Sequence, residues 1–101
     1  MATVLKTFRK VLSSSSAEQV TSTRILTPGF AIRAESNNAG DLYIGDSTVT
    51  SSTGMFILAG EANEKYARAM ARGYTTQYDL SKIYLIGTSG DAVRVEYEVE
   101  E

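Results

Sequence analysis

Four aspartates are the first side chains to consider for chemistry, because each lies in a stretch typical of a turn. They are Asp41, Asp46, Asp79 and Asp91. Calcium takes several hard oxygen ligands, so a cluster of carboxylates can bind it. None of the four shows the alternating aspartates of a calcium-binding loop, and aspartates in turns usually bond their own backbone. The sequence therefore predicts no metal site.

Nucleophilic catalysis is the second chemistry to consider, because the chain is rich in serine. The chain contains no histidine and no cysteine, which removes the commonest general base, the commonest transition-metal ligand and the thiolate nucleophile. It has no Ser-Xaa-Xaa-Lys motif, and its glycine-containing stretches lack the Lys-Ser pair of a phosphate loop. The sequence predicts that the chain is not an enzyme and needs no cofactor.

Six tyrosines offer aromatic rings that could stack on nucleic-acid bases. They are Tyr43, Tyr66, Tyr74, Tyr78, Tyr84 and Tyr97. The net charge is −2, from ten basic and twelve acidic residues, whereas nucleic-acid-binding domains usually carry a basic excess. We interpret the rings as parts of the core edge or of a protein interface, and we predict no nucleic-acid partner.

Alternation of apolar and polar residues with a period of two predicts the elements that would position these side chains. The expected strands span residues 18–26, 30–36, 42–45, 55–58, 82–87 and 92–100. Residues 18–44 are expected to form consecutive antiparallel strands, with a type II turn at Pro28-Gly29, and residues 88–91 to form a hairpin turn. In the last strand, valines 93, 95 and 99 and Tyr97 are expected to face inward, and Arg94 and the glutamates outward.

One stretch, residues 61–73, has a helical pattern. Ala, Glu, Lys, Arg and Met are strong helix formers, the apolar residues recur at spacings of three and four, and Glu64 and Arg68 form a favourable pair at i,i+4. The expected fold is therefore mainly β, a small antiparallel β-sandwich or barrel-like domain with one short helix near 61–72 packed on one side of the sheet.

The 101 residues predict one compact domain, which we divide into an N-terminal segment, 1–17, and a β-rich domain, 18–101. The four serines at 13–16 are typical of a flexible connector. No apolar run approaches the roughly 20 residues that span a bilayer, and the N-terminus lacks the apolar region of a signal peptide. We predict a protein made in the cytosol, without a membrane partner.

The N-terminal segment is basic and apolar, and it has two interpretations. As an arm laid on another subunit, it would bind through Lys6, Phe8, Arg9, Lys10 and Leu12. As an edge strand, it would fold back as the first strand of its own domain. Its basic residues are matched by four glutamates near the C-terminus, so the two ends are expected to meet each other or a neighbouring subunit.

Two stretches resemble a group of small β-rich virion proteins of tailed bacteriophages. They are AIRAESNNAGDLYIGDSTVTSSTGMFILAGE (31–61) and YDLSKIYLIGTSGDAVRVEYE (78–98), which together cover about half of the chain. The matching positions are Ala34, Glu35, Ser36, Asn37, Asn38, Gly40, Tyr43, Gly45, Asp46, Val49, Gly54, Leu58, Gly60, Glu61, Leu80, Tyr84, Gly87, Val93, Val95 and Tyr97. The chain is expected to depart from the group at 62–77, where the group usually continues with a strand-like segment and the sequence predicts a helix.

The resemblance implies a head decoration or cement protein, or the base of a head fibre, without catalysis. Such a protein would bind the major capsid protein on the outer surface of virions assembled in the host cytoplasm, and would stabilise the shell as a homo-oligomer, with a trimer favoured. The loop over 45–54 would then let neighbouring subunits approach closely. The alternatives are a tail or receptor-binding fibre domain, or a carbohydrate-binding β-sandwich module that uses Tyr74 and Tyr78.

Overall fold

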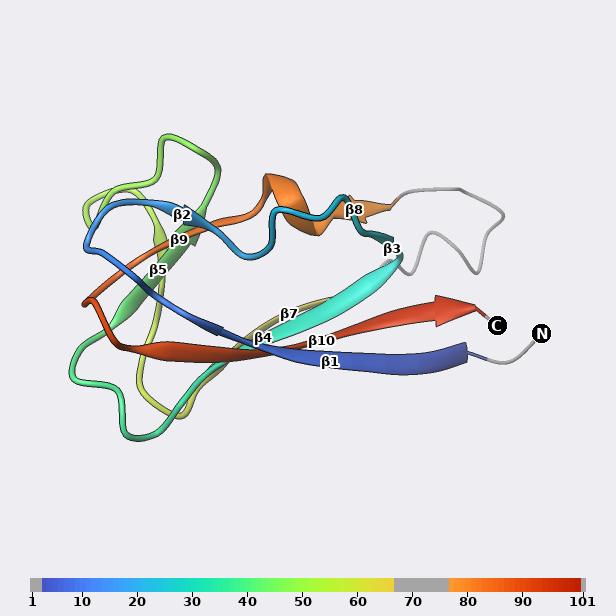
Figure 1. Ribbon diagram of the computed structural model, residues 1–101, viewed down its shortest axis with the longest axis horizontal. Helices are drawn as coiled ribbons and strands as arrows, with labels where there is room; N and C mark the ends of the chain where they lie inside the picture. The colour runs from blue at the N-terminus through green and yellow to red at the C-terminus, as the bar shows by residue number, and fades with distance from the viewer. Residues whose placement is uncertain (1–2, 67–76, 101) are drawn as a thin grey trace.

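The computed structural model describes residues 3–66 and 77–100, and this part of the chain is mainly β (Figure 1). Its strands are β1 (Thr3–Val11), β2 (Glu18–Gln19), β3 (Leu26–Thr27), β4 (Gly29–Ala34), β5 (Leu42–Gly45), β6 (Met55–Ile57), β7 (Ala62–Tyr66), β8 (Tyr78–Asp79), β9 (Tyr84–Ile86) and β10 (Ala92–Glu100). A 3-10 turn, η2 (Leu80–Lys82), lies between β8 and β9. The prediction of a mainly β fold is confirmed.

Two four-stranded antiparallel sheets form the body of the protein. Sheet A has the strand order β1-β10-β4-β7, and sheet B has the order β2-β9-β5-β6; β3 and β8 form a separate two-stranded ribbon. The pairing of β1 with β10 runs without interruption from Thr3 opposite Glu100 to Val11 opposite Ala92. Figure 1 shows β1 and β10 side by side along the length of the molecule, with the start of β1 next to the end of β10.

One buried cluster joins the two sheets. Its side chains come from β4 and β10 of sheet A, from β5, β6 and β9 of sheet B, and from the connections between them. In β10, Val93 and Val95 are buried whereas Arg94 is exposed, as the alternation in the sequence predicts. Burying an aliphatic side chain of this size contributes about 1.5–3 kcal/mol, so this sandwich-like cluster is the main source of stability.

The helix expected near 61–72 is wrong over residues 62–66, which form β7. This strand pairs antiparallel with β4, with Arg33 opposite Ala62 and Ile32 opposite Asn63. Residues 67–72 lie outside the described residues. Helix propensity is a weak preference, and here it is outweighed because the backbone N–H and C=O groups on that edge of β4 need hydrogen-bond partners.

The strands of residues 18–44 do not pair with one another in sequence order. Strand β4 pairs with β10 and β7, and β5 pairs with β6 and β9. The long strand expected over 18–26 is replaced by β2 and β3 with an irregular stretch between them. The turn at 88–91 leads from sheet B into sheet A, so it does not form a hairpin.

The type II turn expected at Pro28-Gly29 is also wrong. Such a turn needs a positive φ at Gly29, and within residues 3–66 and 77–100 only Gly60 and Gly90 have one, at 83° and 94°. Gly29 instead begins β4.

The N-terminal segment forms the outer strand of sheet A, so of its two interpretations the edge strand is the one that the structure shows. Strand β1 pairs with β10 over nine residues, and Leu12, just beyond it, is 1% exposed within the core. The serine run that follows is a turn held by Glu18, whose carboxylate accepts hydrogen bonds from the Ser13 and Ser14 N–H groups at 2.9 and 3.0 Å. The basic and acidic ends of the chain therefore meet each other, in one sheet.

Candidate functional site

The five residues expected to bind a partner do not share one face of β1. They are Lys6, Phe8, Arg9, Lys10 and Leu12. Phe8 packs against the core, with its ring edge-on to that of Tyr97 at 6.0 Å, and Lys10 Nζ lies 3.2 Å from the Glu18 carboxylate. Lys6 lies on the same face of β1 as Phe8 but is exposed, and Leu12 is buried. Arg9 is the member of this set that lies on the outer face of sheet A.

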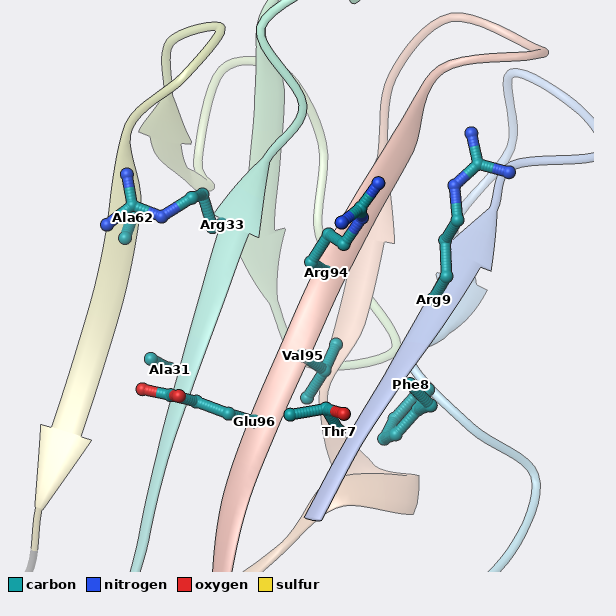
Figure 2. Close-up of a pocket in the computed structure, with 9 residues that line it drawn as sticks. All are labelled: Thr7, Phe8, Arg9, Ala31, Arg33, Ala62, Arg94, Val95 and Glu96. Carbon is teal, nitrogen blue, oxygen red and sulfur yellow. The ribbon is translucent and has the colours of Figure 1, made fainter. Parts of the chain in front are cut away.

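Three arginines lie side by side on that outer face (Figure 2). Arg9 of β1 is opposite Arg94 of β10, and Arg94 is opposite Arg33 of β4. We call Arg9, Arg94 and Arg33 the arginine row. Adjacent strands are about 4.8 Å apart, and like charges directly opposite one another are destabilising. Such a row is therefore unfavourable unless carboxylates compensate it.

Glu35, directly after β4, is the carboxylate that the arginine row contacts. Arg9 donates to it from Nε at 2.7 Å and from Nη2 at 2.9 Å, and Arg94 donates from Nε at 3.1 Å. The hydrogen bonds from Arg9, together with those from Arg94, lower the pKa of Glu35 from 4.5 to about 2, although partial burial opposes this shift. The same contact raises the pKa of Arg9. The row thus has three positive charges and one negative charge at neutral pH.

We expect part of the stability of the protein to be lost as the pH falls from about 4.5 towards 2, because the folded pKa of Glu35 lies below its ordinary value. A depressed carboxyl pKa contributes stability above the unfolded pKa, and this contribution disappears as the pH falls through the folded value. Glu35→Gln should remove this part of the pH dependence, as measured by urea midpoints across that range. Glu61→Gln is the control, because, among the described residues, the Glu61 carboxylate accepts a hydrogen bond from a backbone group, the Leu58 N–H at 3.3 Å, and not from an arginine. Identical pH profiles for Glu35→Gln and the wild type would contradict the prediction.

The arginine row borders a shallow depression of about 560 Å³ in the outer face of sheet A (Figure 2). Small side chains, Ala31 and Ala62, contribute to its lining, and Glu96 of β10 lies in register with Ala31. Guanidinium groups are permanently charged donors that bind oxyanions through two parallel hydrogen bonds. The lining contains no nucleophile next to a general base, so the arrangement is suited to binding an anion.

Strand β6 exposes large apolar side chains at the other sheet. Met55 is 67% exposed, Phe56 64%, and Leu58, just after the strand, 40%; we call these three residues the apolar edge. Within the described part of the chain, β6 is the last strand of sheet B and pairs only with β5. Exposed strand edges are usually protected by charge or proline, and residues 55–58 contain neither. This surface is suited to burial against a partner.

The loop between β5 and β6 packs back on its own sheet. Val49 is 6% exposed, and a Cβ added at Gly45 or Gly54 would lie 2.9 or 2.7 Å from its Cγ2 atom. Positions 45 and 54 therefore need residues without a side chain, so that Val49 can pack between them. The sequence alone did not show this reason for Gly45 and Gly54.

Two of the turn aspartates, Asp46 and Asp79, bond the backbone close to them, whereas Asp91 accepts from the distant Ala39 and Gly40 N–H groups at 2.8 and 3.1 Å. Asp46 accepts from the Thr48 N–H at 2.9 Å, and Asp79 accepts from the Ser81 N–H at 3.0 Å. Within residues 3–66 and 77–100, no group of three His, Cys, Asp or Glu side chains is placed to hold a metal ion. The same ranges contain no helix with the length and apolar character of a bilayer span.

Tyr78, one of the two tyrosines considered for a carbohydrate site, packs edge-on against Phe30 with ring centroids 5.1 Å apart. Its ring is half-buried beside the core. Tyr74 lies outside the described residues.

The sequence identified Arg9 and missed Arg33, Arg94 and Glu35 as members of the same site. Alternation predicted that Arg94 faces outward, and the charge pattern suggested that the two ends of the chain meet. No sequence signal gives the register that aligns Arg9, Arg94 and Arg33. No protein-family model matches the chain, and searches of the curated proteins and of the solved structures returned no match.

Proposed function

We propose that this chain is a structural virion protein of a tailed bacteriophage, a head decoration protein that binds the outer surface of the capsid and stabilises it. The resemblance of residues 31–61 and 78–98 to small virion proteins supports this proposal, and so does the mainly β fold. The protein would act by binding alone, on the surface of virions assembled in the host cytoplasm.

The apolar edge is the observation that supports the proposal most directly. Met55 and Phe56 are about two-thirds exposed, at an edge of β6 that pairs with no strand of the described residues, and both lie within the stretch that resembles virion proteins. Burying side chains of this kind contributes about 1.5–3 kcal/mol each. A capsid protein that covered the edge would recover this free energy and would shield the strand from unwanted pairing.

The major capsid protein is the proposed partner, and we propose that the bound state is a homo-oligomer, with a trimer favoured. A symmetric shell offers many equivalent sites, and closed oligomers match the symmetry axes on which such sites lie. The proposal needs no cofactor, nucleic acid or membrane.

Cosedimentation with purified capsids tests the proposal. We expect wild-type protein to bind heads, in a number of copies that matches trimers at threefold positions. Replacing Met55 and Phe56 by serine should weaken binding at least about tenfold, because each tenfold change corresponds to only about 1.4 kcal/mol. Leu5→Ser is the matched control, since Leu5 is also exposed, at 57%, but lies on sheet A.

Equal binding by the double variant and the wild type would refute the role of the apolar edge. Binding to purified tails and not to heads would favour the fibre alternative, and binding on a glycan array without capsid binding would favour the carbohydrate alternative. A monomer both in solution and on the shell would contradict the trimer.

A further inference from the structure

We propose that the arginine row is a docking site for an acidic segment of a partner protein, which places a carboxylate between Arg94 and Arg33. The site lies on the outer face of sheet A, whereas the apolar edge belongs to sheet B. The inference therefore does not depend on the capsid proposal.

Arg94 and Arg33 retain donors that could bind such a carboxylate. A guanidinium group has five N–H donors. Arg94 contacts Glu35 through Nε, with its side chain 72% exposed, and Arg33 uses Nη1 for the Gly60 carbonyl at 2.8 Å. Among the described residues, the terminal nitrogens of Arg94 make no further hydrogen bond. Figure 2 shows the Arg33 side chain extending over β7 towards Ala62, away from Arg94. In the proposed complex Arg33 turns back towards Arg94, so that the two guanidinium groups share one carboxylate.

Glu35 shows which chemistry the arginine row accepts. Its carboxylate is held by the two-bond fork of Arg9, at 2.7 and 2.9 Å, and by one bond from Arg94. One carboxylate compensates one of three positive charges. Among the described residues, the Glu35 carboxylate accepts hydrogen bonds from Arg9 and Arg94 and none from Arg33. A second carboxylate between Arg94 and Arg33 would relieve the remaining repulsion across the strands.

The surrounding surface favours carboxylates spaced along a polypeptide over a dense polyanion. Glu96 lies two residues after Arg94 along β10, opposite Ala31, and Figure 2 shows it on the same face as the arginines. The net charge of −2 repels a partner in proportion to the partner's own negative charge, so it disfavours a nucleic acid more than a short acidic segment. The side chains of Ala31 and Ala62 are small, so the lining of the depression leaves room for a peptide backbone to approach.

NMR titration of the intact protein with a short peptide of alternating glutamate and serine tests this inference. We expect shifts at the Nε–H groups of Arg33 and Arg94, and weaker binding as salt is raised, since exposed charge interactions are screened. The double variant Arg33→Gln, Arg94→Gln should bind at least about tenfold more weakly. Arg24→Gln is the control for lost charge: the Arg24 side chain is 74% exposed and lies 3.8 Å from Asp79, and its substitution removes one of the positive charges of the chain, where the double variant removes two.

Two further measurements separate a binding role from a structural one. Glu35→Gln leaves three positive charges without a compensating carboxylate, so it should bind the peptide several-fold more tightly; a purely structural role for the arginines would not produce this gain. If the double variant is unfolded by its urea midpoint, the single variant Arg33→Gln replaces it, because the side chain of Arg33 bonds one carbonyl.

Several outcomes would overturn the proposal. One is an equal loss of affinity in Arg24→Gln and in the double variant, and another is the absence of shifts at Arg33 and Arg94. Tighter binding of inorganic sulfate than of the peptide would assign the site to small oxyanions, and tighter binding of an oligonucleotide would assign it to nucleic acid.

Discussion

Deletion of residues 1–12 is expected to unfold the protein. The deletion removes β1, a nine-residue strand of sheet A, and leaves the adjacent edge of β10 unpaired. It also removes Leu12, which is 1% exposed in the core, and the ring of Phe8 that packs on Tyr97. Loss of a buried leucine side chain alone costs about 2–5 kcal/mol, and a domain of this size has a total stability of about 5–15 kcal/mol. The combined loss is comparable with the whole stability of the domain.

Circular dichroism and urea denaturation measure this result, and a pair of leucine variants isolates its cause. Leu12→Ala should cost about 2–5 kcal/mol because its cavity lies between the sheets. Leu5→Ala, in the same segment but 57% exposed, should change stability by no more than about 0.5 kcal/mol. A truncated protein that stays folded but no longer binds capsids would show instead that the segment is a binding arm.

The strands that alternation predicts best are those with one face in the core. Residues 92–100 form β10 with the expected bounds, and the predicted strands at 30–36, 42–45 and 55–58 correspond to β4, β5 and β6 within about two residues. Burial on one side imposes a period of two on the sequence, so these elements leave a local signal.

Which strand lies beside which could not be predicted, because pairing is decided by contacts between distant residues. The stretch 62–66 has helix-forming residues, yet it pairs with β4 as β7. The turn at 88–91 resembles a hairpin, yet it links two sheets. The edge of a strand needs hydrogen-bond partners for its N–H and C=O groups. Neither local composition nor turn chemistry shows which distant segment supplies them.

The arginine row depends on the same missing information. Arg9, Arg33 and Arg94 each lie at an outward-facing position of a different strand, and only the register of β1, β10 and β4 brings them into line. The apolar edge, by contrast, was visible in the sequence as an apolar strand without charges. Its exposure became evident only when β6 was placed at the border of sheet B.

Gly54→Val is expected to destabilise the protein by about 1–3 kcal/mol or more, because it overpacks the loop between β5 and β6. A Cβ at this position would lie 2.7 Å from Val49 Cγ2, 2.8 Å from Tyr43 Cβ and 3.1 Å from the Thr50 carbonyl oxygen. The backbone cannot easily move away, since the Gly54 N–H donates to the Thr50 carbonyl at 2.9 Å. Urea denaturation measures the loss, and the NMR signals of Val49 should report displacement from its buried position.

A double-mutant cycle and a glycine control show whether contact with Val49 is the cause of the loss of stability. In the background Gly54→Ala, adding Val49→Ala removes the nearest methyl group, so the two losses should sum to more than the loss in the double variant, with a coupling of about 0.5 kcal/mol or more. Gly40→Ala is the matched glycine control: its added Cβ would meet only the exposed Thr88 hydroxyl, at 3.2 Å, which can rotate away. Additive losses in the Gly54 and Val49 variants, or an equal loss in Gly40→Ala, would show that the loop tolerates bulk and that its glycines serve another purpose, such as the close approach of a neighbouring subunit.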